Sequence, residues 1–73
     1  MAREPIEAPL PGKIMDISVS LGGAIAEGDL VCTIESMKME NPILSPVGGK
    51  VAEIKVSKGQ TVRGGDVLFV IER

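Results

Sequence analysis

The chain has 73 residues and a net charge of −2, with eight Lys or Arg residues against ten Asp or Glu residues. This length suits one small domain with little surplus stability. Because the chain has no His, Trp or Tyr and only one Cys, the usual zinc sites and the Ser-His and Cys-His nucleophile pairs are excluded.

The charge and hydropathy patterns also argue against several partners. No basic run or aromatic platform suggests nucleic acid. No apolar stretch is long enough for membrane insertion, and the N-terminus does not resemble a signal peptide. A lone cysteine makes no disulfide framework, so we expect a cytoplasmic protein in which Cys32 is a buried core thiol.

The sequence contains an internal duplication. Residues 5–35 align with residues 42–72 without a gap, and 13 of the 31 aligned pairs are identical. The identities fall on prolines, turn glycines and apolar positions, such as Pro5 with Pro42, Gly28 with Gly65 and Ile34 with Ile71. The chain is therefore two copies of one structural unit, and residues 36–41 join them.

The first copy predicts four short strands in chain order. Residues 1–4 match nothing useful in the second copy and are expected to be a flexible end. Residues 5–9 are bracketed by prolines, which suits an edge strand. Residues 13–19 alternate apolar and polar side chains, residues 24–25 leave room for a very short strand, and residues 30–35 form the last one.

The second copy repeats these elements over residues 42–72. Alternation assigns two sets of apolar side chains to the core: Leu30, Cys32 and Ile34, with their copies Val67, Phe69 and Ile71. Turns at Gly28-Asp29 and Gly65-Asp66 predict positive φ at the glycines and carboxylates that bond their own backbone.

These elements predict an all-β fold of eight short strands, four from each half. Gly or Pro interrupts the chain too often for a helix of ordinary length. One half alone would expose an apolar face, so we expect the two halves to close a barrel around a pseudo-two-fold axis. Residues 36–41 then form a hairpin at one end of a single domain that spans residues 5–73.

The tripeptide Met37-Lys38-Met39 has two interpretations. Taken alone, apolar–charged–apolar describes a half-buried strand with a solvated lysine. At an exposed hairpin tip, however, two methionines do not serve the core and do offer a pliable apolar contact to a partner. A lysine held there suits acylation by an enzyme, which removes its charge and leaves a long tether.

Residues Glu35-Ser36-Met37-Lys38-Met39-Glu40 resemble the biotin attachment motif of biotin carboxyl carrier domains, whose core is Ala-Met-Lys-Met. The flanks agree over nearly the whole chain, from Glu27-Gly28-Asp29-Leu30 before the motif to a regularly spaced set after it: Ile43, Ser45-Pro46, Gly49, Val51, Ile54, Val56, Gly59, Val62, Gly65 and Leu68. Ser36 replaces the usual Ala and is similarly small.

The resemblance implies a flattened β-barrel, or barrel-sandwich hybrid, with biotin attached covalently to Lys38. A biotin protein ligase would recognise Met37 and Met39, with Glu35 and Ser36 flanking the motif. The biotinyl-lysine would carry carboxylate as carboxybiotin from a biotin carboxylase to a carboxyltransferase or decarboxylase. The gapless repeat leaves no room for the protruding thumb of some such carriers, which indicates the thumbless type, either free-standing or part of a longer chain.

Three other functions remain open from the sequence. A lipoyl domain shares the fold and the lysine position, although Met on both sides favours biotin, and dual modification stays possible. An unmodified interaction barrel would use the tip only as a protein contact. An enzyme acting alone would need catalytic carboxylates, but Asp29 and Asp66 lie in repeated turns where a structural role is expected.

Overall fold

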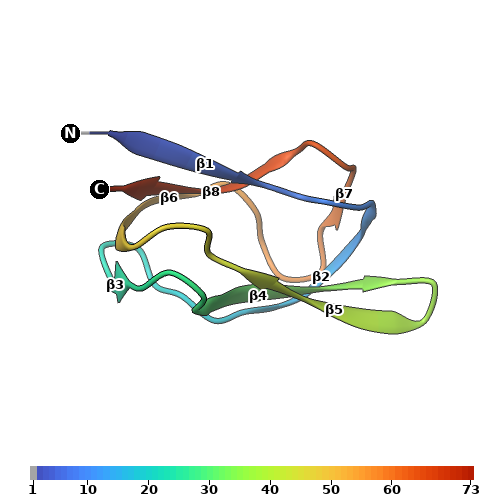
Figure 1. Cartoon of the computed structure of the whole chain (residues 1–73). Coiled ribbons are helices and arrows are strands. Elements are labelled where there is room, and N and C mark those ends of the chain that lie inside the picture. The colour runs from blue at the N-terminus through green and yellow to red at the C-terminus, as the bar shows by residue number, and fades with distance from the viewer. Residues whose placement is uncertain (1) are drawn as a thin grey trace.

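Eight strands form two four-stranded antiparallel sheets that lie face to face (Figure 1). This computed structural model describes residues 2–73, so Met1 lies outside the described residues. The strands are β1 (Arg3–Glu7), β2 (Gly12–Ile17), β3 (Ala24–Ile25), β4 (Leu30–Ser36), β5 (Met39–Leu44), β6 (Gly49–Ile54), β7 (Thr61–Val62) and β8 (Val67–Glu72). No helix long and apolar enough to cross a membrane occurs within residues 2–73.

Each sheet takes two strands from each half of the sequence. Sheet A has the order β1-β8-β6-β3, and sheet B has the order β5-β4-β2-β7. Exchanging the two copies of the repeat converts one order into the other, as the predicted pseudo-two-fold symmetry requires. Four of the six strand pairs join the two halves, namely β1–β8, β3–β6, β4–β5 and β2–β7. The all-β prediction is confirmed, and the halves are interleaved rather than stacked as separate sheets.

The first strand begins at Arg3, two residues before the predicted edge strand. Arg3 and Glu4 pair with Glu72 and Ile71 of β8, and β1 does lie at the edge of sheet A. Arg3 also forms ion pairs with Glu53 on β6 and Glu72 on β8. Arg3 itself lies outside the aligned repeat, which begins at residue 5. The ordered sheet therefore includes residues that the sequence analysis assigned to a loose end.

The core lies between the sheets and consists of aliphatic side chains around Phe69. Its fully buried members come from both halves: Ile14, Val31, Cys32, Ile34, Val51, Val62, Leu68, Phe69 and Ile71. Burial of each larger side chain contributes about 1.5–3 kcal/mol. Burial also raises the pKa of the Cys32 thiol to about 11, so this thiol stays protonated at neutral pH, as expected for a core residue.

Two predicted core positions, Leu30 and its counterpart Val67, are wrong. Leu30 is 41% exposed and Val67 is only half-buried, whereas Val31 and Cys32 are both fully buried. The pairing of β4 with β5 shifts register between Leu30 and Cys32. Such a β-bulge inserts an extra residue and reverses the inside–outside alternation, which a strict period of two does not anticipate.

The two repeated turns have the geometry that the sequence predicted. Gly28 and Gly65 have φ values of 88° and 92°. The carboxylate of Asp29 accepts a hydrogen bond from the Ala26 backbone N–H at 2.9 Å. The Asp66 carboxylate does the same with the Arg63 N–H, also at 2.9 Å. Both carboxylates are thus engaged in holding turns, which is the structural role expected of them.

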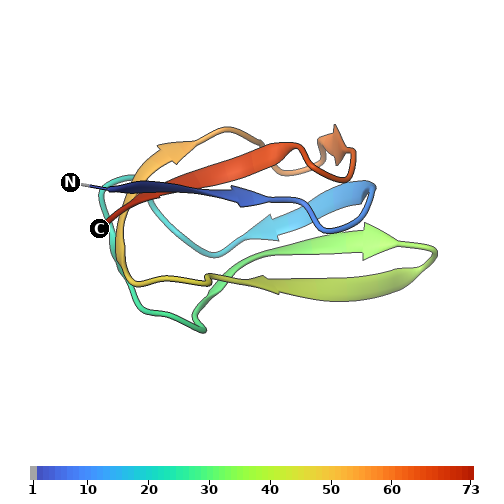
Figure 2. The same cartoon turned by 45° about the horizontal axis from the view of Figure 1, so that its top comes forward.

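The molecule is elongated, and its two ends differ. It measures 36 × 18 × 17 Å along its principal axes. The two chain termini lie together at one end, and the hairpin of β4 and β5 projects from the other (Figures 1 and 2). A hydrogen bond of 2.8 Å from the Arg73 N–H to the Ala2 carbonyl ties the terminal strands together.

We predict that Gly65→Ala lowers the free energy of unfolding by about 1–2 kcal/mol, because a Cβ is disfavoured at positive φ. No atom lies within 4 Å of the position that this Cβ would take, so the loss reports backbone strain and not a clash. Urea unfolding measures it. Gly64→Ala is the matched control, since its Cβ would approach only the Leu10 Cα, at 3.9 Å. Equal stability of the two variants would contradict the strain argument.

Candidate functional site

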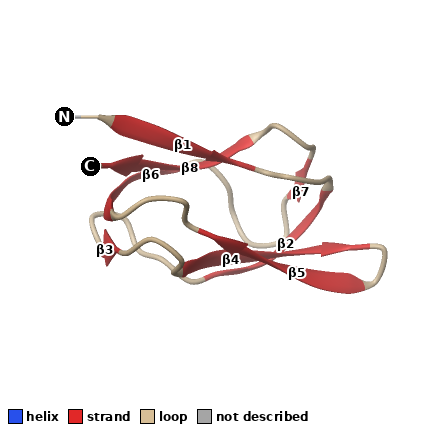
Figure 3. Ribbon diagram, viewed as in Figure 1, coloured by secondary structure: helices blue, strands red, loops and turns tan. Residues whose placement is uncertain are grey.

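A two-residue turn connects β4 to β5 at the exposed end of the molecule (Figure 3). Ser36 and Met39 form the last strand pair, so Met37 and Lys38 are the two loop residues. Their φ values are 54° and 64°. Two successive left-handed residues define a type I′ turn, whose twist matches that of the flanking strands.

Neither loop residue is of the type that this turn ordinarily takes. Type I′ turns favour Asn-Gly or Gly-Gly, because other residues are strained at positive φ by about 1–2 kcal/mol each. Met37 and Lys38 remain there because the β4–β5 ladder holds both ends of the loop. Strain of this kind concentrates at functional sites. Here it fixes the direction in which the backbone presents Lys38.

The side chains of the turn point into solvent. Met37 is 92% exposed and Met39 is 66% exposed, and Lys38 is exposed between them. Better-formed hollows lie elsewhere, such as a groove of about 300 Å³ between β1 and β5 that four prolines help to line. Lys38 is therefore displayed at the tip of the hairpin, with two apolar side chains beside it for a partner to contact.

The side chain of Asn41 supports the turn. Its Nδ2 donates hydrogen bonds to the carbonyl of Ile34 at 3.3 Å and to the carbonyl of Met39 at 3.2 Å. Asn41 pairs with Ile34 across the ladder, so the bond to Ile34 connects β5 to β4 just behind the tip, while the bond to Met39 stays within β5. Asn41 lies within the predicted hairpin of residues 36–41, but its residue type alone predicts no role there. By the 37-residue offset of the repeat, the counterpart of Asn41 is Glu4, which lies just before the aligned copies begin.

The remaining predicted motif residues occupy the stem of the hairpin. Ser36 is partly buried beside the turn, and Glu35 is exposed. Glu35 pairs directly with Glu40 across the β4–β5 ladder, a juxtaposition of like charges that the sequence reading did not identify. Within residues 2–73, no group of three or more His, Cys, Asp and Glu side chains is arranged to hold a metal ion.

Comparison with known protein families shows which family the chain belongs to. The model of the biotin/lipoyl attachment family, described as "biotin-requiring enzyme", matches residues 4–71. Because this match covers nearly the entire chain, the chain belongs to that family. It is a biotinyl carrier domain of the kind found in biotin-dependent carboxylases and in a decarboxylase.

Curated relatives match about half of the chain. The methylmalonyl-CoA decarboxylase subunit gamma of Veillonella parvula is 45% identical over 38 residues, which are 52% of this chain and 30% of that subunit. The mitochondrial propionyl-CoA carboxylase alpha chain of Homo sapiens is 47% identical over 36 residues, 49% of this chain and 5% of the relative. The mitochondrial pyruvate carboxylase of Mus musculus is 49% identical over 35 residues, 48% of this chain and 3% of the relative.

Solved structures match the complete fold. A single-chain, multi-domain long-chain acyl-CoA carboxylase superposes with a TM-score of 0.91 at 27% identity, covering 97% of this chain and 7% of that one. The urea carboxylase of Kluyveromyces lactis also gives a TM-score of 0.91, at 29% identity, covering 99% of this chain and 6% of that one. The chain thus corresponds to a small part of much longer enzymes.

We predict that Asn41→Asp lowers the free energy of unfolding by about 1–3 kcal/mol at neutral pH, because a carboxylate would face two carbonyl oxygens without a proton to donate. Protonation restores one donor. The folded state therefore raises the pKa of the introduced carboxyl, and the loss grows as the pH rises through the unfolded-state value.

Urea unfolding at pH 4 and at pH 7 measures this loss. Glu7→Gln is the control, because it changes an exposed carboxylate that forms none of the ion pairs described and leaves both Asn41 bonds in place. A pH-independent loss in Asn41→Asp would contradict the role assigned to the amide.

Proposed function

We propose that Lys38 is the residue of this carrier domain to which biotin is attached covalently. We further propose that the attached biotin carries carboxylate between a biotin carboxylase and a carboxyltransferase or decarboxylase. On this proposal the chain is non-catalytic by itself, since it presents the biotin and other subunits perform the chemistry.

The observation that carries the proposal is the position of Lys38. It is an exposed lysine on a strained two-residue turn, between Met37 and Met39, at the end of the molecule opposite the termini (Figure 1). Membership of the biotin-requiring family makes attachment to such a lysine the chemistry that best explains the strain and the exposed methionines.

A primary amine on a tip fits an amide-linked group. Because a solvated ammonium group has no free electron pair, a modifying enzyme must remove a proton before the Lys38 Nζ attacks. With ATP as the activating co-reactant, the biotin carboxyl becomes an acyl adenylate and pyrophosphate leaves. The Nζ then forms an amide bond, AMP leaves, and the second proton passes to solvent. The long arm that results has lost its charge and extends from a rigid base.

The shape of the domain supports a role as a mobile carrier. The tip and the termini lie at opposite ends of a body 36 Å long. A chain or partner attached at the termini would therefore leave Lys38 free to enter another active site. A biotin protein ligase would contact Met37 and Met39, which are apolar, flexible and exposed on both sides of the target amine.

We expect Lys38→Arg to fold with an unchanged melting temperature and to accept no biotin, because guanidinium retains the charge but is not a nucleophilic amine. Intact-mass measurement after incubation with a biotin protein ligase, ATP and biotin checks this. Lys50→Arg, at an exposed position of β6 that pairs with Glu72 of the C-terminal strand, is the matched control and should label fully.

Other results of the same measurement would overturn the proposal. Biotin on Lys38→Arg at another lysine would contradict the site assignment. A lipoyl group found on Lys38 in protein purified from the source organism would assign lipoyl chemistry in place of biotin.

We expect Met39→Asp to slow biotinylation by about tenfold or more, because a ligase that reads an apolar side chain would meet a carboxylate there. Its melting temperature should stay close to that of the wild type. Leu21→Asp is the control, since Leu21 is 67% exposed and Met39 is 66% exposed, but Leu21 lies in a distant loop. Slower labelling of both variants to the same degree would show that the effect is not specific to the tip.

A further inference from the structure

The duplication provides an internal comparison for every exposed residue. A side chain in one sheet has a counterpart in the other sheet that occupies the same position in the same fold. Where two exposed counterparts differ in charge or polarity, the fold itself does not require either of them. The outer faces of the two sheets differ in this way close to the hairpin.

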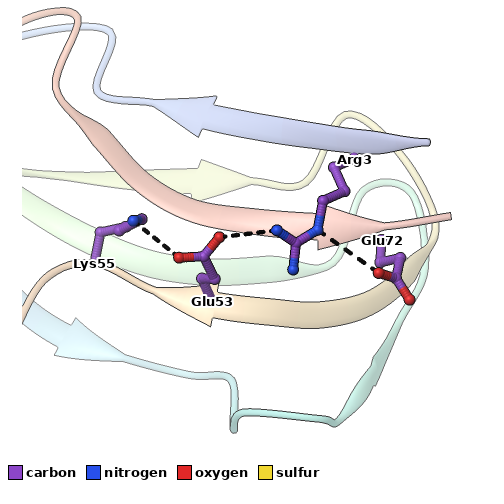
Figure 4. A network of polar contacts seen from close by, with 4 residues as sticks. All are labelled: Arg3, Glu53, Lys55 and Glu72. Atoms are coloured by element: carbon purple, nitrogen blue, oxygen red, sulfur yellow. Dashed lines mark hydrogen bonds and ion pairs between the residues drawn. The ribbon is translucent and has the colours of Figure 1, made fainter. Parts of the chain in front are cut away.

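The outer face of sheet A carries a neutralised network (Figure 4). Arg3 on β1 reaches Glu53 on β6 at 3.2 Å and Glu72 on β8 at 3.6 Å. Because β8 lies between β1 and β6, the Arg3 side chain crosses over β8. Lys55 also contacts Glu53 at 2.9 Å. The hydrogen bond and charge of Lys55, and then the charge of Arg3, lower the pKa of the Glu53 carboxyl.

The outer face of sheet B lacks the counterparts of these two cations, and the cation beside its carboxylates is Lys13, which pairs with Glu35 across the β2–β4 ladder as Lys50 pairs with Glu72 in sheet A. The two cations of sheet A correspond to other residue types, since Arg3 becomes Glu40 and Lys55 becomes Ser18. The two carboxylates are retained, since Glu53 becomes Asp16 and Glu72 becomes Glu35. Two cations and two carboxylates in sheet A thus become three carboxylates and one hydroxyl in sheet B. We call Asp16, Glu35 and Glu40 the acidic face. None of the ion pairs found among residues 2–73 involves a member of it.

The acidic face contains a repulsive contact. Glu35 on β4 and Glu40 on β5 are direct cross-strand partners, and like charges at such positions are destabilising. In sheet A the same pair of positions holds Glu72 and Arg3. The fold therefore accepts an arginine at this place, and the sequence has a glutamate there instead.

An apolar pair continues the same surface away from the tip. Leu44 follows Glu40 by four residues on β5, so both side chains leave the same side of the strand, about 13 Å apart. Leu44 pairs with Leu30, and they are 53% and 41% exposed. The counterpart of Leu44 is Glu7, which is exposed on β1. Apolar character at Leu44 is thus not a requirement of the fold either.

We propose that the acidic face, together with Leu30 and Leu44, docks the carboxyltransferase or decarboxylase subunit through an arginine of that subunit. In the docked complex, the guanidinium lies over β4 among Asp16, Glu35 and Glu40, as Arg3 lies over β8 in sheet A. An apolar side chain of the subunit packs on Leu30 and Leu44. This inference rests on the proposed attachment of biotin to Lys38, which lies at the end of the same hairpin.

The chemistry of the occupant follows from charge and geometry. The three carboxylates are not arranged to hold a metal ion, and sheet A shows that one guanidinium can contact two carboxylates on neighbouring strands. Subunits that transfer a carboxyl group bind carboxylated, anionic substrates, so cationic side chains near their active-site entrance are expected. Docking would neutralise the Glu35–Glu40 repulsion and bring the lysine tip to that entrance.

Glu40→Arg tests the proposal, because it supplies from within the chain the arginine that the partner is inferred to provide. Its melting temperature should rise by about 2–4 °C at low salt, since repulsion is replaced by an ion-pair network. The biotinylated variant should nevertheless bind the purified carboxyltransferase subunit of the source organism about tenfold more weakly. Isothermal titration calorimetry at two salt concentrations measures the Kd.

Leu21→Arg is the control, because it adds an arginine at a position that is 67% exposed, in the loop whose Gly22 N–H bonds to the Val51 carbonyl of sheet A. Its Kd should stay within about twofold of the wild-type value, since its charge is distant from the docked subunit. Leu44→Glu, which copies the residue found at the equivalent place in sheet A, should weaken binding by about threefold or more at high salt, where charge effects are screened.

The outcomes separate the two proposals. If wild-type Lys38 accepts no biotin, the proposed function fails. If labelled Glu40→Arg binds as tightly as the wild type, or if Leu21→Arg weakens binding equally, the docking surface is wrong and the proposed function stands. If Glu40→Arg folds but is no longer biotinylated, the acidic face serves the ligase, and the inference about the carboxyltransferase is overturned.

Discussion

Backbone pairing between the two halves of the sequence is the constraint on which this structure depends. Neither half forms a sheet of its own, because four of the six strand pairs take one strand from each half. The core between the sheets is consequently built from both copies and closes only when they are interleaved. One of the joining pairs, β4 with β5, is also the hairpin that presents Lys38. The same ladder that stabilises the barrel therefore holds two non-glycine residues at positive φ.

The symmetry of the fold separates structural requirements from other ones. Residues that are the same in both copies stabilise the barrel. Examples are Gly28 and Gly65, which both have positive φ, and Asp29 and Asp66, whose carboxylates accept equivalent turn bonds. Counterparts that differ on the surface, such as Glu40 and Arg3, are free of that requirement. Because an ion-paired arrangement exists in one copy, the repulsive arrangement in the other is a departure that the barrel does not need.

Much of the fold and of the candidate site was readable from the sequence. The repeat gave the number of strands, the edge position of β1 and the turn geometry, since glycines and prolines recur at fixed places. Three features were not readable. The bulge at Leu30 reverses alternation without a residue type that marks it. Arg3 joins the sheet through partners far away in sequence, and the Asn41 amide reaches the Ile34 carbonyl only because the closed hairpin brings β4 beside β5.

The sequence by itself determined that a lysine between two methionines stands at the join of a duplicated β domain, because periodicity and turn residues are local properties of the chain. Tertiary structure alone decided which strands are neighbours and which surface side chains face one another. Glu35 and Glu40 are separated by a turn, whereas Arg3 and Glu72 come from the two ends of the chain, yet both pairs occupy equivalent positions in the two sheets. Their opposite electrostatics become visible only when strand order places them side by side.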